Sequence, residues 1–156
     1  MRNIATLLDE RLILLDADVT SAEQCIRTMA DLFETYGYVK PGYGDAVVER
    51  EKGFPTGLPG KGINIAIPHT NNALVNKPAV GVIVPRQAVE FAVMGQKETK
   101  ISCELILPLV VQDTKRQMAM LKKMMKIIQD GELLQNLRHA KDKQTILQLL
   151  SVLNDD

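Results

Sequence analysis

The amino-acid sequence predicts an α/β fold: a single domain, residues 1–156, with a mixed, mostly parallel β-sheet flanked by helices on both faces. Three observations predict it. Short apolar runs of strand length recur between residues 12 and 111, helical segments lie among them, and the pattern is helical from residue 114 onward. With 46% apolar residues, a chain of 156 residues can bury the core of one domain.

The first half of the chain predicts a strand, two helices and a second strand. Residues 12–15 form a short apolar strand, and a capping box that runs from Thr20 to Gln24 opens a helix. One face of that helix is apolar at steps of three and four: Ala22, Ile26, Met29, Phe33 and Tyr36. A second helix is expected over residues 45–52. The next strand carries isoleucine at every second position from residue 63, and it must end at Pro68, which has no N–H to donate.

The second half predicts two paired strands, a longer strand and terminal helices. Residues 80–84 and 89–93 are expected to pair through a short connection, and Pro108 indicates a bulge, an edge or an early end in the apolar run that follows. From Thr114 the pattern is helical, with two apolar stripes: Gln117, Leu121, Met124 and Ile128, then Ile146, Leu149, Leu150 and Leu153. Helical spacing places most of the nearby methionines in the core, and an adaptable partner surface is the alternative: Met118, Met120, Met124 and Met125.

The composition argues against several classes of protein. Basic and acidic residues each total 19, so no net field favours nucleic acid or an anionic membrane. No run approaches the roughly 20 apolar residues of a membrane-spanning helix, and no signal-like run develops at the N-terminus. Cys25 and Cys103 lack the spacing of a zinc or redox motif. We therefore expect a cytoplasmic protein with buried thiols, no cofactor, no metal, no nucleic-acid partner and no membrane insertion.

The segment that ends at His69 carries the strongest functional signal. Because the strand before it stops at Pro68, His69 is expected at the rim of the sheet. A lone histidine after a strand is more often structural, so the assignment depends on what accompanies it. The second histidine, His139, lies among charges near a helix end, where a favourable interaction with the helix dipole explains it.

Residues upstream of His69 favour a functional site. Arg50 supplies a fixed cation, and the turn-rich segment that follows contains Thr56 and Gly57. Arg50 could instead form an exposed ion pair with a neighbouring glutamate, which is worth only about 0.2–1 kcal/mol. Its place just before the turn favours the functional interpretation. A cation, a hydroxyl and a tight turn beside a histidine indicate a site that handles an anion.

These residues resemble the enzyme IIA domains of the fructose and mannitol type in the sugar phosphotransferase system (PTS). In that family an Arg-Glu pair, a Thr-Gly turn and an Ala-x-Pro-His strand end follow one another. Here they are Arg50-Glu51, Thr56-Gly57 and Ala66-Ile67-Pro68-His69. The resemblance is specific over residues 48–70, and the element order over residues 5–153 is similar. It implies the mannitol- and fructose-type IIA fold.

Two departures narrow the resemblance. The segment from Phe54 to Leu58 is more similar to the galactitol branch than to the mannitol or fructose branch. Where those branches often have a second histidine, this chain has Gln117, which is also similar to galactitol-type proteins. From its own position, Gln117 has two interpretations of equal weight. It could contact the phosphoryl group or His69, or it could complete a capping box with Thr114.

The resemblance implies that His69 accepts a phosphoryl group from the carrier protein HPr and passes it to a cysteine of a cognate enzyme IIB. The membrane component IIC would deliver the group to an incoming sugar alcohol, galactitol being the expected one. Phosphoryl transfer mainly requires in-line positioning and donors around the equatorial oxygens. Arg50 suits this role because its planar fork binds such oxygens bidentately, and Thr56 and the amides around Gly57 are further donors. The alternative is a nitrogen-type regulatory IIA, whose phosphorylation state controls binding to a regulator.

Overall fold

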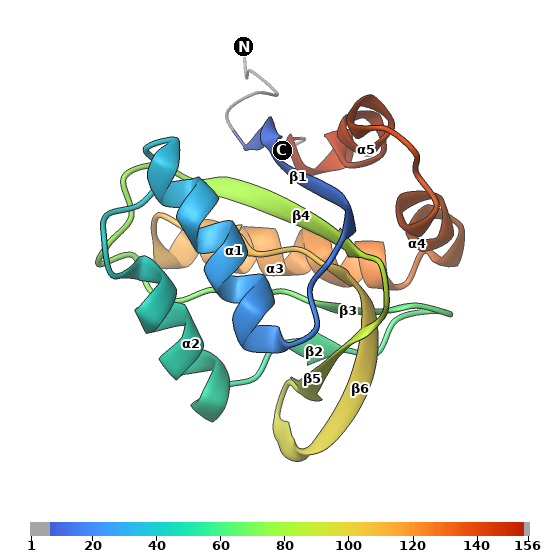
Figure 1. Cartoon of the computed structure of the whole chain (residues 1–156), viewed down its shortest axis with the longest axis horizontal. Helices are drawn as coiled ribbons and strands as arrows, with labels where there is room; N and C mark the ends of the chain where they lie inside the picture. Colours follow the sequence, from blue (N-terminus) through green and yellow to red (C-terminus); the bar gives the residue numbers. More distant parts are fainter. Residues whose placement is uncertain (1–6, 155–156) are drawn as a thin grey trace.

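The computed structural model describes residues 7–154, which form one mixed sheet covered by helices (Figure 1). The strands are β1 (Leu8–Ala17), β2 (Gly57–Leu58), β3 (Asn64–Ala66), β4 (Ala79–Pro85), β5 (Val89–Val93), β6 (Gln96–Ile106) and β7 (Leu109–Val110). The helices are α1 (Ala22–Thr35), α2 (Tyr43–Gly53), α3 (Thr114–Ile128), α4 (Gly131–Arg138) and α5 (Lys143–Leu149), followed by a 3₁₀ turn, η2 (Ser151–Asn154). The predicted α/β class is confirmed.

The order of the strands in the sheet is β1-β4-β6-β3-β2-β5, with β7 added beside β4 and a further pairing between β5 and β6. The pairings β1–β4, β2–β5 and β3–β6 are parallel, whereas β2–β3, β4–β6, β4–β7 and β5–β6 are antiparallel. The sheet is therefore mixed as predicted, but it is not mostly parallel. Two of the antiparallel pairings, β2–β3 and β5–β6, join strands that follow one another in the sequence.

One predicted pairing is wrong. Strands β4 and β5 exist where the sequence places them, but each pairs with β6 and not with the other. The antiparallel partner of β5 is the first part of β6, from Val89 opposite Cys103 to Val93 opposite Gln96. β4 meets β6 only near its far end, where Ile83 lies opposite Ile106. The long strand β6 thus serves both neighbours, and Pro108 separates it from β7, in agreement with the predicted early strand end.

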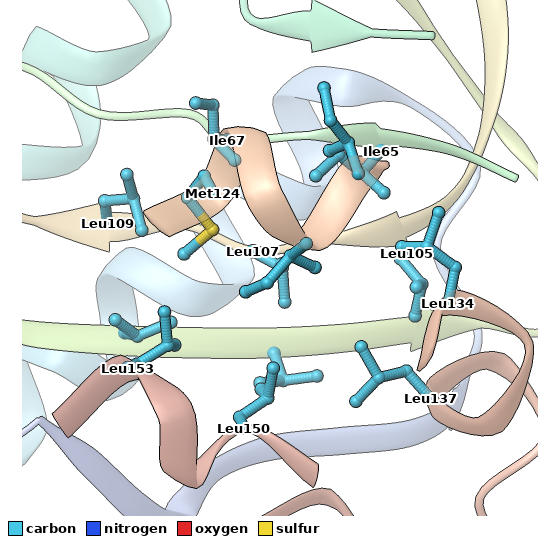
Figure 2. Packing of buried hydrophobic residues seen from close by; sticks show 14 of the residues in the cluster. Ile65, Ile67, Leu105, Leu107, Leu109, Met124, Leu134, Leu137, Leu150 and Leu153 are labelled. Atoms are coloured by element: carbon cyan, nitrogen blue, oxygen red, sulfur yellow. The ribbon is translucent and has the colours of Figure 1, made fainter. Parts of the chain in front are cut away.

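Helices cover both faces of the sheet, as predicted. On one face α1 and α2 pack over β4 and β6 through residues such as Met29, Phe33 and Val47. On the other face α3, α4 and α5 pack on the same strands (Figure 2). Figure 2 shows side chains of this second cluster from β3, β6, β7, α3, α4 and η2 and from residues that adjoin these elements: Ile65, Ile67, Leu105, Leu107, Leu109, Met124, Leu134, Leu137, Leu150 and Leu153.

Strand β3 and the residues that flank it divide their side chains between the two cores. Ile63, Ile65 and Ile67 enter the cluster under the C-terminal helices, while Ala66 enters the cluster under α1 and α2. This confirms the predicted alternation. The strand ends at Ala66, and the chain beyond it stays beside β6 and β7, because Leu107 N–H donates to the Ala66 carbonyl at 2.8 Å and Leu109 N–H donates to the Pro68 carbonyl at 2.9 Å. These bonds fix the backbone immediately before His69.

Helix caps agree with the sequence at α1 and differ from it at α3. The Ser21 hydroxyl accepts from the Gln24 N–H, and the Gln24 side chain returns to the Thr20 N–H at 2.8 Å. At α3 the N-cap is Asp113, whose carboxylate accepts from the Arg116 N–H at 2.8 Å. Of the two interpretations of Gln117, the capping box with Thr114 is therefore wrong, because Asp113 occupies the capping position one residue earlier.

Other expectations concern thiols and membranes. Cys25 and Cys103 are free and buried, and burial raises the pKa of each thiol to about 12, so both are inert core residues. Over residues 7–154, every helix is too short or too polar to cross a bilayer.

Candidate active site at the end of strand β3

His69 lies in the loop that follows β3, where it is almost completely enclosed, with 4% of its surface exposed. Its imidazole Nδ1 lies 2.7 Å from the carbonyl oxygen of Ile67. A carbonyl can only accept, so Nδ1 carries the proton in the neutral ring. The other nitrogen, Nε2, therefore carries no proton in the neutral ring, and its lone pair is available as an acceptor or a nucleophile.

The environment of His69 keeps the ring neutral. Burial lowers the pKa of the imidazole below its ordinary value of 6.5, and the positive charge of Arg50 lowers it further, although the hydrogen bond to Ile67 acts in the opposite direction. Nucleophilic attack through Nε2 requires the unprotonated ring. The lowered pKa keeps the His69 ring neutral at neutral pH.

Arg50 lies in the last turn of α2, where its charge acts on His69. Its guanidinium carbon is 5.1 Å from the centre of the Phe54 ring, and its buried Nε has no hydrogen-bond partner among residues 7–154. A buried N–H without an acceptor costs about 1–3 kcal/mol, so its presence calls for an explanation. An incoming anion would supply the missing acceptor. The structure therefore brings Arg50 and His69 together as predicted.

Thr56 and Gly57 are in the predicted place, but their visible contacts are structural. The Thr56 N–H and hydroxyl both lie 2.8 Å from the carboxylate of Glu51, one on each oxygen, so both Thr56 donors are engaged. Gly57 lies in β2, where a Cβ atom would come within 2.6 Å of the Ala92 carbonyl oxygen. The turn thus needs glycine for the close approach of β5, and it needs Thr56 to anchor Glu51.

Glu51 has no role in the predicted site, yet its carboxylate holds this turn. Burial raises the pKa of its carboxyl to about 7, against the effect of the Thr56 hydrogen bonds and of the Arg50 charge, which lower the pKa. The only signal in the sequence was its place beside Arg50 in the motif. Its burial depends on how α2 packs on the sheet, which the motif does not encode.

Gln117 faces the Nε2 atom of His69. Its side-chain nitrogen lies 3.5 Å from Nε2, a long contact, and it comes from the first turn of α3. A small hollow of about 60 Å³ adjoins it, lined by Asn71, Asn72, Val111, Asp113, Thr114 and Gln117. Of the two interpretations of Gln117, the structure supports the contact with His69. A phosphoryl group on Nε2 would also lie near the N-terminus of α3, where the helix dipole favours an anion.

The apolar residues near His69 differ in exposure. Phe54 is 66% exposed beside Arg50, whereas Leu58 and Ile67 are buried. Clusters of three or more metal-ligating side chains are absent from residues 7–154. The site thus consists of one enclosed histidine between a cation on α2 and an amide on α3.

Comparison with known proteins identifies the family. The family described as "Phosphoenolpyruvate-dependent sugar phosphotransferase system, EIIA 2" matches residues 6–152, and the chain belongs to this family. It is accordingly a phosphotransferase component of a sugar PTS. A relative from Haloferax volcanii, named as a fructose-specific EIIA component of the PTS, is 26% identical over 151 residues, which cover 96% of this chain and 95% of that protein.

Solved structures share the fold. The mannitol enzyme IIA of Escherichia coli, in its complex with phosphorylated enzyme IIB, has a TM-score of 0.77 at 22% identity and covers 94% of this chain and 99% of its own. The nitrogen regulatory protein IIA-Ntr of Neisseria meningitidis has the same TM-score of 0.77 at 21% identity, and covers 94% of this chain and 97% of its own. The mannitol- and fructose-type IIA fold is thus confirmed, and the fold alone does not separate the transport proteins from the regulatory ones.

Proposed function

We propose that His69 accepts a phosphoryl group from phosphorylated HPr and passes it to a cysteine of a cognate enzyme IIB. The observation that supports this most directly is the orientation of the ring. Nδ1 is tied to the Ile67 carbonyl at 2.7 Å, which leaves the unprotonated Nε2 facing Gln117. In the first step, the Nε2 lone pair forms a new N–P bond while the N–P bond of the donor histidine breaks.

Arg50 and Gln117 stabilise the group in transfer. The unpartnered Nε of Arg50 supplies a charged donor, and the Gln117 amide supplies a neutral one beside Nε2. Glu51 engages both donors of Thr56, so we assign Thr56 and Gly57 to shaping the turn that presents Arg50, with direct contact to phosphate a lesser role. In the second step, a cysteine thiolate of IIB attacks phosphorus, an S–P bond forms, and the N–P bond to His69 breaks. Neither step requires a metal ion.

We propose galactitol as the sugar. It would enter through the membrane component IIC and receive the phosphoryl group that IIB takes from His69, with the IIA chain acting in the cytoplasm. Support comes from the Phe54 segment and from Gln117 in place of a second histidine, both similar to the galactitol branch. The named relatives concern fructose and mannitol, and their low identity leaves the sugar open to test. The second candidate is the nitrogen-type regulatory role, which is favoured by the equal likeness of the fold to IIA-Ntr.

The test is transfer of labelled phosphate from phosphorylated HPr to the wild type, to His69→Ala and to His139→Ala. The chain has only these two histidines, and His139 contacts the Gln135 carbonyl at a helix end, so it is the matched control. We expect His139→Ala to be labelled and His69→Ala to stay unlabelled. Labelling of His69→Ala would refute the proposal.

Galactitol-, mannitol- and fructose-type IIB proteins are then added separately to the labelled chain. Discharge onto the galactitol-type IIB at the highest rate supports the proposed sugar, and faster discharge onto another IIB identifies that sugar instead. Label that persists with all three, together with phosphate-dependent binding to a regulator, would favour the nitrogen-type role.

A further inference from the structure

The solvent side of α3 presents methionine where the sequence predicts core. Met118 is 57% exposed and Met125 is 44% exposed, whereas Met124 is buried and Met120 is half-buried. The expectation of core packing therefore fails for two of the four. Met118 and Met125 are seven residues apart, so they lie on one stripe of the helix, two turns from each other. Exposed methionine is common at surfaces that adapt to a partner.

The same helix carries a strong local excess of positive charge. Residues 114–128 contain five cations and no acidic residue, although the whole chain is neutral: Lys115, Arg116, Lys122, Lys123 and Lys126. Arg116 is paired with Asp113, and the Lys123 ammonium donates to the Leu153 carbonyl at 2.9 Å. The other three lysines form no ion pair within residues 7–154.

The arrangement of these side chains around the helix is ordered. At 3.6 residues per turn, the angular order of side chains around the helix axis can be read from the sequence. Leu121 comes next to Gln117, followed by the stripe of Met118 and Met125. A row of lysines follows that stripe, at residues 115, 122 and 126. Gln117 contacts His69, so the apolar stripe lies between the reactive histidine and the lysine row. We call the side chains of Leu121, Met118, Met125 and this lysine row the α3 face.

We propose that the α3 face is the docking surface for the cysteine-bearing acceptor IIB, and that the matching surface of IIB is apolar at its centre and bordered by carboxylates. This inference rests on the proposed function. An apolar centre with a charged rim is the usual anatomy of a protein interface, and lysines bordering it suit an acidic partner. Continuity with His69 through Gln117 places the docked cysteine within reach of the phosphoryl group.

The chemistry of the two transfers indicates that the positive charge of the α3 face assists binding of the acceptor IIB rather than of HPr. A cysteine attacks as the thiolate, and nearby cations lower the pKa of a thiol. The donor histidine instead leaves most readily when its ring is protonated, which a cationic surface opposes. The solved mannitol IIA with the same fold is itself in complex with a IIB protein.

The experiment measures the Kd of the galactitol-, mannitol- or fructose-type IIB that discharges His69, and compares wild type with Lys115→Glu/Lys122→Glu. Lys61→Glu/Lys141→Glu is the matched control with the same change of charge. Lys61 precedes β3, at the opposite end of that strand from His69, and Lys141 lies between α4 and α5. Circular dichroism shows whether each variant is folded. A further variant, Met118→Ala/Met125→Ala, tests the apolar stripe without altering charge.

We expect Lys115→Glu/Lys122→Glu to weaken IIB binding at least tenfold at low salt, with most of the difference lost in high salt, and the control pair to stay within about twofold of wild type. Met118→Ala/Met125→Ala should weaken binding at least fivefold at either salt concentration. The loss of affinity should be larger for IIB than for phosphorylated HPr, whose transfer rate to each variant is measured separately.

Three results would overturn the inference: unchanged IIB affinity in both α3 variants, an equal or larger loss toward HPr, or binding of the wild type to vesicles of anionic lipid that the lysine changes abolish. Failure of the proposed function gives a different result. In that case phosphorylated HPr does not label His69 in the wild-type chain at all.

Discussion

Glu51 offers a direct test of how the turn beside the site is held. Its carboxyl accepts both Thr56 donors at 2.8 Å, yet burial raises its pKa from 4.5 to about 7. Glutamine at position 51 is nearly isosteric with the protonated acid. Its oxygen can accept from the Thr56 N–H, and its NH₂ can donate to the Thr56 hydroxyl oxygen.

The sign and size follow from proton linkage. Between pH 4.5 and about 7, an unfolded chain releases the Glu51 proton while the folded chain keeps it, so the free energy of unfolding falls as the pH rises. Each pH unit costs about 1.4 kcal/mol, which gives up to about 3 kcal/mol over this window. Above about pH 7 the contribution is constant. Glutamine does not titrate, so Glu51→Gln lacks this loss of stability. Its free energy of unfolding should equal that of the wild type near pH 4.5 and exceed it by up to about 3 kcal/mol at pH 8.

The assay is urea unfolding of wild type and Glu51→Gln at several pH values over this range, followed by far-UV circular dichroism. Taking the difference between the two proteins cancels other titrating groups, including His69, whose lowered pKa gives stability the opposite slope below pH 6.5. Glu49→Gln adds an amide to an exposed position of the same helix and is the control, with an expected effect under about 0.5 kcal/mol. A difference that does not change with pH, or that falls as the pH rises, would refute the reasoning.

Three further predictions concern the site and its supports. The rate at which phosphorylated HPr labels His69 should fall with acidification around a midpoint below pH 6.5, because burial and Arg50 lower the pKa of the ring; a midpoint at or above 6.5 would contradict this. In thermal unfolding, Asp113→Ala should destabilise the protein by about 1 kcal/mol, because Asp113 caps α3, and Thr114→Ala by less than about 0.5 kcal/mol. A larger loss for Thr114→Ala than for Asp113→Ala would indicate that Thr114 caps the helix instead. Gly57→Ala should cost about 2–3 kcal/mol in urea unfolding, because its Cβ would meet the carbonyl oxygen of β5 at 2.6 Å; a neutral result would show that β2 and β5 separate easily.

Sequence reasoning succeeded where the deciding physics is local. The alternation of β3 and its end before Pro68 depend on neighbouring residues alone, and they place His69 at the sheet rim. The Ser21 cap of α1 and the strand end at Pro108 are similarly short-range. The family motif added the expected order of cation, turn and histidine, and the structure brings Arg50 close enough to act on His69.

Tertiary structure decided what depends on distant partners. The short connection after Pro85 indicates a hairpin, yet β4 and β5 both bond to β6, because the first part of that long strand offers β5 a continuous antiparallel partner. Burial of Glu51 and exposure of Met118 depend in the same way on how α2 and α3 lie on the sheet.

The two interpretations of Gln117 show the limit most clearly. Both require a polar residue in the first turn of α3, so the sequence alone could not separate them. Only the position of that helix, 48 residues further along the chain than the histidine, puts the amide 3.5 Å from Nε2 and leaves capping to Asp113. The sequence by itself thus determined the strand and the position of His69 at its end, since spacing and backbone chemistry suffice for both. The tertiary structure determined which side chains surround the nucleophile, since contacts across tens of residues are set by the packing of whole elements.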